Sequence, residues 1–73
     1  MPKLGRFSGS DVRNILERNG FAFVRQKGSH MVMQKSEGNT TVTAIVPAHK
    51  QLRIGTLQSI VRQSQLSREL FEV

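Results

Sequence analysis

Residues 21–35, FAFVRQKGSHMVMQK, contain two strand-forming runs that flank a short turn. Phe21–Gln26 is rich in strand formers and alternates in character, and His30–Lys35 does the same. Between them, Lys27-Gly28-Ser29 is typical of a tight turn, with Gly28 as the natural occupant of a positive-φ position. The stretch therefore predicts a β-hairpin.

The alternation of the second strand divides its side chains between the two faces of a sheet. One face receives Met31, Met33 and Lys35, and the other receives His30, Val32 and Gln34. We assign the two methionines to the core. His30 is then expected on the open face beside the turn, and Val32 is expected to be partly exposed.

Upstream of the hairpin, the pattern predicts a helix that ends at about residue 19. Ser8 and Asp11 have the spacing of a capping box, although Glu or Gln more often occupies the second position. The apolar stripe of an amphipathic helix follows at Val12, Ile15 and Leu16. Asn19-Gly20 ends the helix, since both residues tolerate the left-handed conformation of a C-cap.

Downstream of the hairpin, residues 36–39 form a second turn that leads into a third strand. This strand, Thr40–Val46, is β-branched at six of its seven positions. Pro47 stops it, because proline cannot donate a hydrogen bond to the ladder. Residues 48–53 are then a polar connector.

A second helix is predicted from about residue 53 or 54 to residue 64. Its apolar stripe consists of Leu57, Ile60 and Val61. Ser67 can cap one last short turn, which is expected to bring Leu70 and Phe71 back to the core.

These elements give the order α-β-β-β-α, which belongs to the α+β class. A three-stranded antiparallel meander with both helices on one face satisfies every apolar stripe. A chain of 73 residues corresponds to a single domain, here taken as residues 1–73. One core of this size supplies about 3–5 kcal/mol of stability.

The charge of the chain favours a polyanionic partner. Eleven Lys and Arg residues against five Asp and Glu residues leave a formal net charge of +6. Neither residues 18–36 nor residues 38–68 contain an acid. Nucleic acid is the first candidate for a partner of such a chain. The alternative is that the charge merely keeps the protein soluble.

Several other functions find little support in the sequence. With two His and no Cys, it has no cluster at metal-ligand spacing, and it has no phosphate loop or nucleophile elbow. We therefore expect neither a metal nor a small-molecule cofactor. No apolar run approaches the length of a signal-peptide core or a membrane span. We expect a soluble, cytoplasmic protein that does not bind membranes.

His30 is the candidate catalytic residue. An imidazole titrates near neutral pH, so it can accept a proton from a ribose 2′-hydroxyl or donate one to a leaving oxygen. Lys27 and Arg25 are close in sequence and are candidates to hold a phosphate, while Gly28 and Ser29 expose turn amides to it. The alternative is an ordinary surface histidine at the start of a strand.

The connector contains the other candidate RNA-binding residues. His49 is either a second catalytic base or a simple loop histidine. Lys50 and Arg53 lie just before the second helix, whose N-terminal dipole adds to their attraction for phosphate. The same residues could equally form a solvated connector. No Tyr or Trp is present to stack on bases, so recognition by shape and phosphate is expected.

The sequence also resembles the HicA-type toxins of bacterial toxin–antitoxin pairs, also called the YcfA-like family. The resemblance extends from Phe7 to about Phe71. It is carried by Gly20-Phe21, by Arg25-Gln26-Lys27-Gly28-Ser29-His30, by Pro47 with His49, by Gly55-Thr56-Leu57 with Ile60 and Gln63, and by Leu66-Ser67. The order and spacing of these short pieces together make the signal specific.

This resemblance implies the fold of a double-stranded-RNA-binding domain. It implies a ribonuclease that cleaves messenger RNA until an antitoxin protein of the HicB type covers it, with His30 as the catalytic histidine. The usual family motif is Gly-Ser-His-His, and here Met31 replaces the second His. We expect the replacement to be tolerated, since that position points to the core. The alternative function is a non-catalytic RNA-binding module of the same fold.

Overall fold

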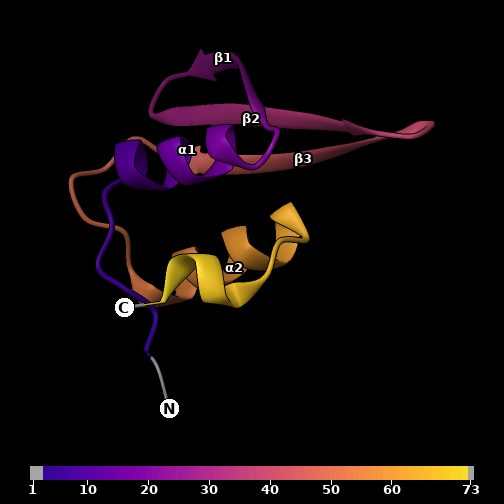
Figure 1. Ribbon diagram of the computed structural model, residues 1–73. Helices are drawn as coiled ribbons and strands as arrows, with labels where there is room; N and C mark the ends of the chain where they lie inside the picture. The colour runs from indigo at the N-terminus through magenta and orange to yellow at the C-terminus, as the bar shows by residue number, and fades with distance from the viewer. Residues whose placement is uncertain (1–2, 73) are drawn as a thin grey trace.

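The computed structural model describes residues 3–72 and has the predicted order of elements. Two helices and three strands follow one another as α-β-β-β-α, with a short 3-10 helix at the end (Figure 1). The elements are α1 (Gly9–Arg18), β1 (Ala22–Lys27), β2 (His30–Glu37), β3 (Thr40–Pro47), α2 (Ile54–Ser64) and η1 (Arg68–Phe71). The α+β class is therefore confirmed.

The strands form one antiparallel sheet in the order β1-β2-β3, so β2 lies in the middle. Two-residue turns at Gly28-Ser29 and Gly38-Asn39 connect them, and the φ angles of the two glycines are +59° and +60°. A positive φ at only the first central position is the pattern of a type II′ turn, which suits the twist of a hairpin. The second turn is shorter than predicted, because β2 continues to Glu37, which pairs with Thr40.

Helix α1 begins and ends at the predicted signals. The Ser8 hydroxyl accepts from the Asp11 N–H, and the Asp11 carboxylate accepts from the Ser8 N–H, each at 3.0 Å. At the other end, the N–H of Phe21 donates to the carbonyl of Leu16 at 3.0 Å, as in a Schellman motif. Phe21 is buried and belongs to this helix end, so β1 begins one residue later than predicted.

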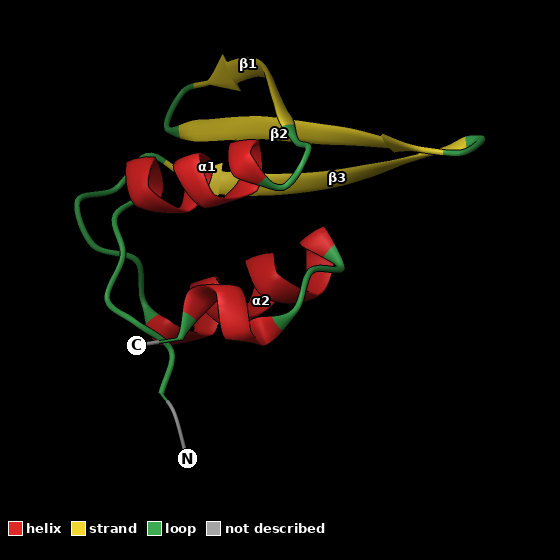
Figure 2. Ribbon diagram, in the orientation of Figure 1, coloured by secondary structure: helices red, strands yellow, loops and turns green. Residues whose placement is uncertain are grey.

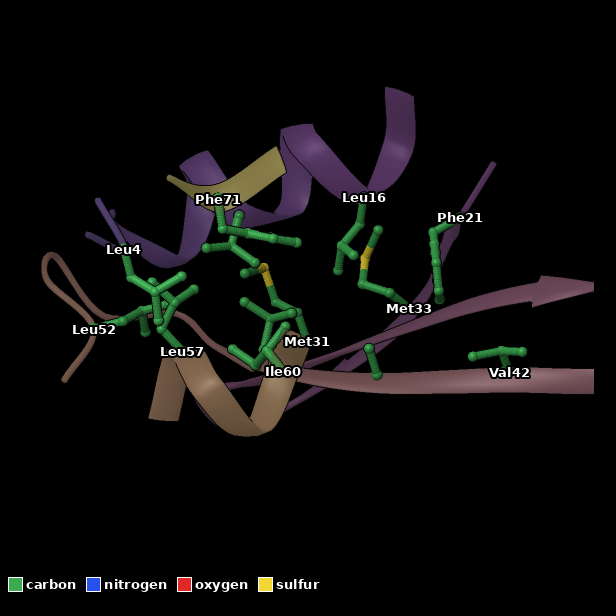
Figure 3. Packing of buried hydrophobic residues seen from close by; sticks show 13 residues of the cluster. Leu4, Leu16, Phe21, Met31, Met33, Val42, Leu52, Leu57, Ile60 and Phe71 are labelled. Carbon is green, nitrogen blue, oxygen red and sulfur yellow. The ribbon is translucent and has the colours of Figure 1, made fainter. Parts of the chain in front are cut away.

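The core lies between the sheet and the helices, on one side of the sheet (Figures 2 and 3). Met31 and Met33 of β2 are buried there, as predicted. Every further element except the exposed strand β1 contributes its apolar stripe: Val12 and Leu16 from α1, Val42, Ala44 and Val46 from β3, Leu57 and Ile60 from α2, and Phe71 from η1. The two helices thus cover the same face of the sheet.

Two predicted exposures were wrong. Val32 is only 8% exposed, although it lies on the open face. It sits in the central strand between Arg25 and Ile45, and cross-strand neighbours on both sides shield a residue in that position. Leu70 is 42% exposed, whereas Phe71 is fully buried. A 3-10 helix has three residues per turn, so two consecutive side chains cannot both face the core.

A side chain of α2 completes the hydrogen bonding at the free edge of β3. The N–H of Ile45 donates to the Oε1 atom of Gln63 at 3.0 Å. Because β3 is an edge strand, this N–H has no partner strand on that side. Gln63 therefore ties α2 to the edge of the sheet.

We expect Gln63→Ala to lower the free energy of unfolding by about 0.5–1.5 kcal/mol, the usual net value of one hydrogen bond. Urea unfolding of the variant and of Gln58→Ala would measure the difference. Gln58 lies on the same helix and is exposed, so it is the matched control. Equal midpoints for the two variants would show that the bond to Ile45 adds no stability.

Candidate functional site

The turn between β1 and β2 presents His30 on the molecular surface. His30 pairs with Lys27 across the turn, and both residues are exposed. The side-chain amide of Gln26 donates from Nε2 to the carbonyl of Gly28 at 2.9 Å, and this hydrogen bond stabilises the turn. The imidazole is therefore held at the start of β2, next to a cation and two exposed turn residues.

The segment after β3 is hydrogen-bonded to this turn. On its other side, His30 pairs with Pro47, and the N–H of Ala48 donates to the carbonyl of Ser29 at 2.6 Å. The next residue, His49, accepts at its carbonyl from the N–H of Gly9, at 2.8 Å. Residues 47–50 are thus placed at the same end of the sheet as His30.

Gly9 makes this arrangement possible, and its role could not be predicted from local sequence patterns. It is buried at the start of α1, where a Cβ atom would collide with the carbonyl oxygen of Pro47 and approach the Cα atom of Ala48 to 3.1 Å. The backbone of α1 therefore rests directly on the backbone of residues 47–48. A glycine at the start of a helix is the only local signal, and it does not reveal what the helix touches.

The cations predicted to bind RNA are available to a ligand. Arg25, Lys27, Lys50 and Arg53 are all exposed, and none of them belongs to an ion pair within residues 3–72. The acids that do pair are engaged with other cations, in the pairs Arg13–Glu17, Lys35–Glu37 and Arg68–Glu72. The electrostatic attraction of these four cations for phosphate is therefore not neutralised locally.

Arg53 is the one member of the predicted set that is positioned separately. It occupies the N-cap position of α2. The preceding residue, Leu52, is buried, and its N–H donates to the carbonyl of Phe7 at 2.8 Å. The position of Arg53 therefore depends on α2 and on the residues before α1. The positions of His49 and Lys50 depend instead on the hydrogen bond between Ala48 and the turn.

Met31 lies where the sequence placed it, in the core, with 4% exposure. A histidine at this position would point away from His30, to the opposite face of β2.

Within residues 3–72 no three His, Asp or Glu side chains gather at a distance suited to a metal ion. The same residues include no helix that is both long and apolar enough to cross a bilayer.

The arrangement has the geometry for acid–base work on a phosphate ester: an exposed imidazole, neighbouring cations and turn amides at one end of a sheet. A family model described as "HicA toxin of bacterial toxin-antitoxin" matches residues 9–66 of the chain. The chain belongs to the HicA toxin family. No curated protein sequence matches it closely enough to count as a relative.

The match to the HicA family covers every part of the site. It begins at Gly9, includes the turn with His30 and residues 47–50, and ends two residues after α2. Membership makes this HicA chain a toxin of a bacterial toxin–antitoxin system. It also implies an antitoxin as its protein partner.

Proposed function

We propose that this HicA toxin is a metal-independent endoribonuclease that cleaves messenger RNA in the cytoplasm and so inhibits translation, with His30 as catalytic acid or base. The observation that carries the proposal is the exposed His30 imidazole at a turn flanked by cations without acidic partners. Transesterification at phosphorus needs groups that transfer protons, as an imidazole can, and cations that stabilise the charge on the phosphate.

The reaction follows from the groups that are present. A base removes the proton of the ribose 2′-hydroxyl, and the 2′-oxygen forms a bond to the adjacent phosphorus. The bond from phosphorus to the 5′-oxygen of the next nucleotide then breaks, and an acid protonates that oxygen. Lys27 and Arg25 stabilise the negative charge that grows on the phosphate. The products are a 2′,3′-cyclic phosphate and a 5′-hydroxyl.

One imidazole cannot serve as base and acid in the same step, so a second group is required. His49 and Lys50 are the candidates, because the bond from Ala48 to Ser29 holds their segment against the turn. Both side chains are exposed. Position 31 faces the core, so the second group comes from residues 49–50 or from solvent.

The antitoxin is proposed to be a protein of the HicB type that covers the same end of the sheet. The chain has a net charge of +6, so the surface proposed to bind RNA is basic. An acidic inhibitor would compete with RNA for this surface directly.

The order α-β-β-β-α also supports the proposed relationship to double-stranded-RNA-binding domains.

Incubation of the purified protein with a long RNA in the presence of a metal chelator tests the function. We expect cleavage with 2′,3′-cyclic phosphate ends, detected by end-specific labelling of the products. Added HicB-type antitoxin is expected to stop it. If the RNA binds in a salt-dependent manner but stays intact at every protein concentration, the chain is a non-catalytic RNA-binding module instead.

A further inference from the structure

The open face of the sheet continues the site beyond the turn. In the sheet register, Arg25, Val32 and Ile45 lie side by side one row beyond His30, and Gln34 and Thr43 lie side by side in the next row. We call these five residues the open-face strip. Rows on one face of a strand are about 7 Å apart, so the strip and His30 together span about 14 Å.

The strip has the charge expected of a surface that binds a polyanion. On the open face of the described sheet, none of the three strands carries an Asp or Glu side chain. The single acid of these strands, Glu37, shares its face with Lys35, Met33 and Met31, and its carboxylate lies 4.0 Å from Lys35 Nζ. Arg25 belongs to no ion pair within residues 3–72.

The strip also offers apolar surface and hydrogen-bonding groups. Ile45 is 37% exposed beside the covered Val32, so the strip presents a large apolar side chain to solvent. The next row is polar, and the side chains of Gln34 and Thr43 are joined by a hydrogen bond of 3.4 Å. From His30 outward, a row with a cation and an aliphatic platform is therefore followed by a row with an amide.

We propose that the substrate is single-stranded RNA, which runs from His30 along the open-face strip, with its phosphates on Arg25 and Lys27 and its bases over Ile45 and Gln34. This inference rests on the proposed function and adds its substrate class and path. A duplex presents phosphates and 2′-hydroxyls to a protein, and has no use for an aliphatic platform. An unpaired base has both an apolar face for Ile45 and edges for the Gln34 amide.

This assignment changes the expectation from composition, which favoured recognition by shape and phosphate because Tyr and Trp are absent. The aromatic residue of β1, Phe23, is no substitute, since its ring lies 4.2 Å from the Arg13 guanidinium on α1. Aliphatic contact replaces aromatic stacking on the strip. The platform exists only when three strands are aligned, so composition could not reveal it.

A pair of Gln→Glu variants tests the strip. The probe is a single-stranded RNA of about 12 nucleotides with every 2′-hydroxyl methylated, which binds but cannot be cleaved by its own 2′-oxygen. We expect Gln34→Glu to weaken its binding about fivefold to tenfold, because the new carboxylate repels the phosphates. Gln58→Glu adds the same charge on α2 and is expected to change binding less than twofold.

A second pair guards against an effect of Gln34 on folding. Arg25→Gln is expected to reduce the slope of log affinity against log salt by about 0.7, the value for one phosphate contact on a single strand. Arg18→Gln removes an exposed cation of α1 and is expected to leave the slope unchanged. Thermal melting of all four variants confirms that each one is folded.

The results separate the path of the RNA from its cleavage. If both strip variants bind the RNA like their controls while the wild type cleaves RNA, the proposed path of the RNA along the strip is wrong and the proposed function stands. If the strip variants lose RNA binding but neither they nor the wild type cleave RNA, the path along the strip is supported and the proposed endoribonuclease activity is wrong. Tighter binding of the same RNA annealed to its complement, or no binding of the single strand at all, would overturn the assignment.

Discussion

His30→Ala is expected to abolish RNA cleavage and the growth arrest that the toxin causes. General acid–base catalysis by a positioned side chain contributes about 10²–10⁴-fold to a rate, and alanine removes all of it. His30 is exposed and belongs to the open face, so its loss leaves the core intact. RNA affinity should fall little, because Lys27, Arg25 and the loop cations remain. The variant should therefore bind RNA without cleaving it.

The measurement compares wild type, His30→Ala and His49→Ala, each induced in a bacterium that lacks the antitoxin and each assayed as purified protein. His49→Ala is the second test variant, since it removes an exposed imidazole from the adjoining segment. A partial loss with His49→Ala would identify it as the second proton-transfer group. Equal growth arrest by wild type and His30→Ala would exclude His30 as the catalytic residue.

Local patterns predicted the elements because each signal acts over a few residues. The capping pair Ser8 and Asp11, the turn glycine Gly28 and the Ser67 cap all make the contacts that their spacing indicates. The errors arose where neighbours distant in sequence decide the outcome. Val32 is covered because β1 and β3 lie on both sides of it, and the strand's own alternation contains no information about them.

The candidate site was predictable only in part for the same reason. The turn with His30 is a contiguous motif, so the sequence located it. Its connection to residues 47–50 depends on a hydrogen bond between Ala48 and Ser29, which are nineteen positions apart, and on the seating of Gly9 against Pro47. Gln63 was visible as a family residue, but its bond to Ile45 requires α2 to lie along β3.

Gly9→Ala is expected to destabilise the fold strongly. The added methyl group would meet the Pro47 carbonyl oxygen and the Ala48 Cα atom, which are backbone atoms and cannot rotate away. Overpacking of this kind costs about 1–3 kcal/mol. A single core of this size supplies only about 3–5 kcal/mol. The midpoint of thermal unfolding should therefore fall by roughly 4–24 °C, at about 4–8 °C per kcal/mol.

Gly55→Ala makes the same chemical change near the start of α2 and is the matched control. Within the described chain, a Cβ atom at Gly55 meets no other atom within 4 Å. Alanine is the better helix former, so this variant should gain about 0.5–1 kcal/mol. The two substitutions should thus shift the unfolding midpoint in opposite directions. A stabilising effect of Gly9→Ala would mean that α1 does not rest on Pro47, so that only the pairing of β2 with β3 and the hydrogen bond from Ala48 to Ser29 hold residues 47–50 beside His30. A destabilised Gly9→Ala protein that still cleaves RNA normally when folded would show that the contact of α1 with Pro47 serves stability and not cleavage.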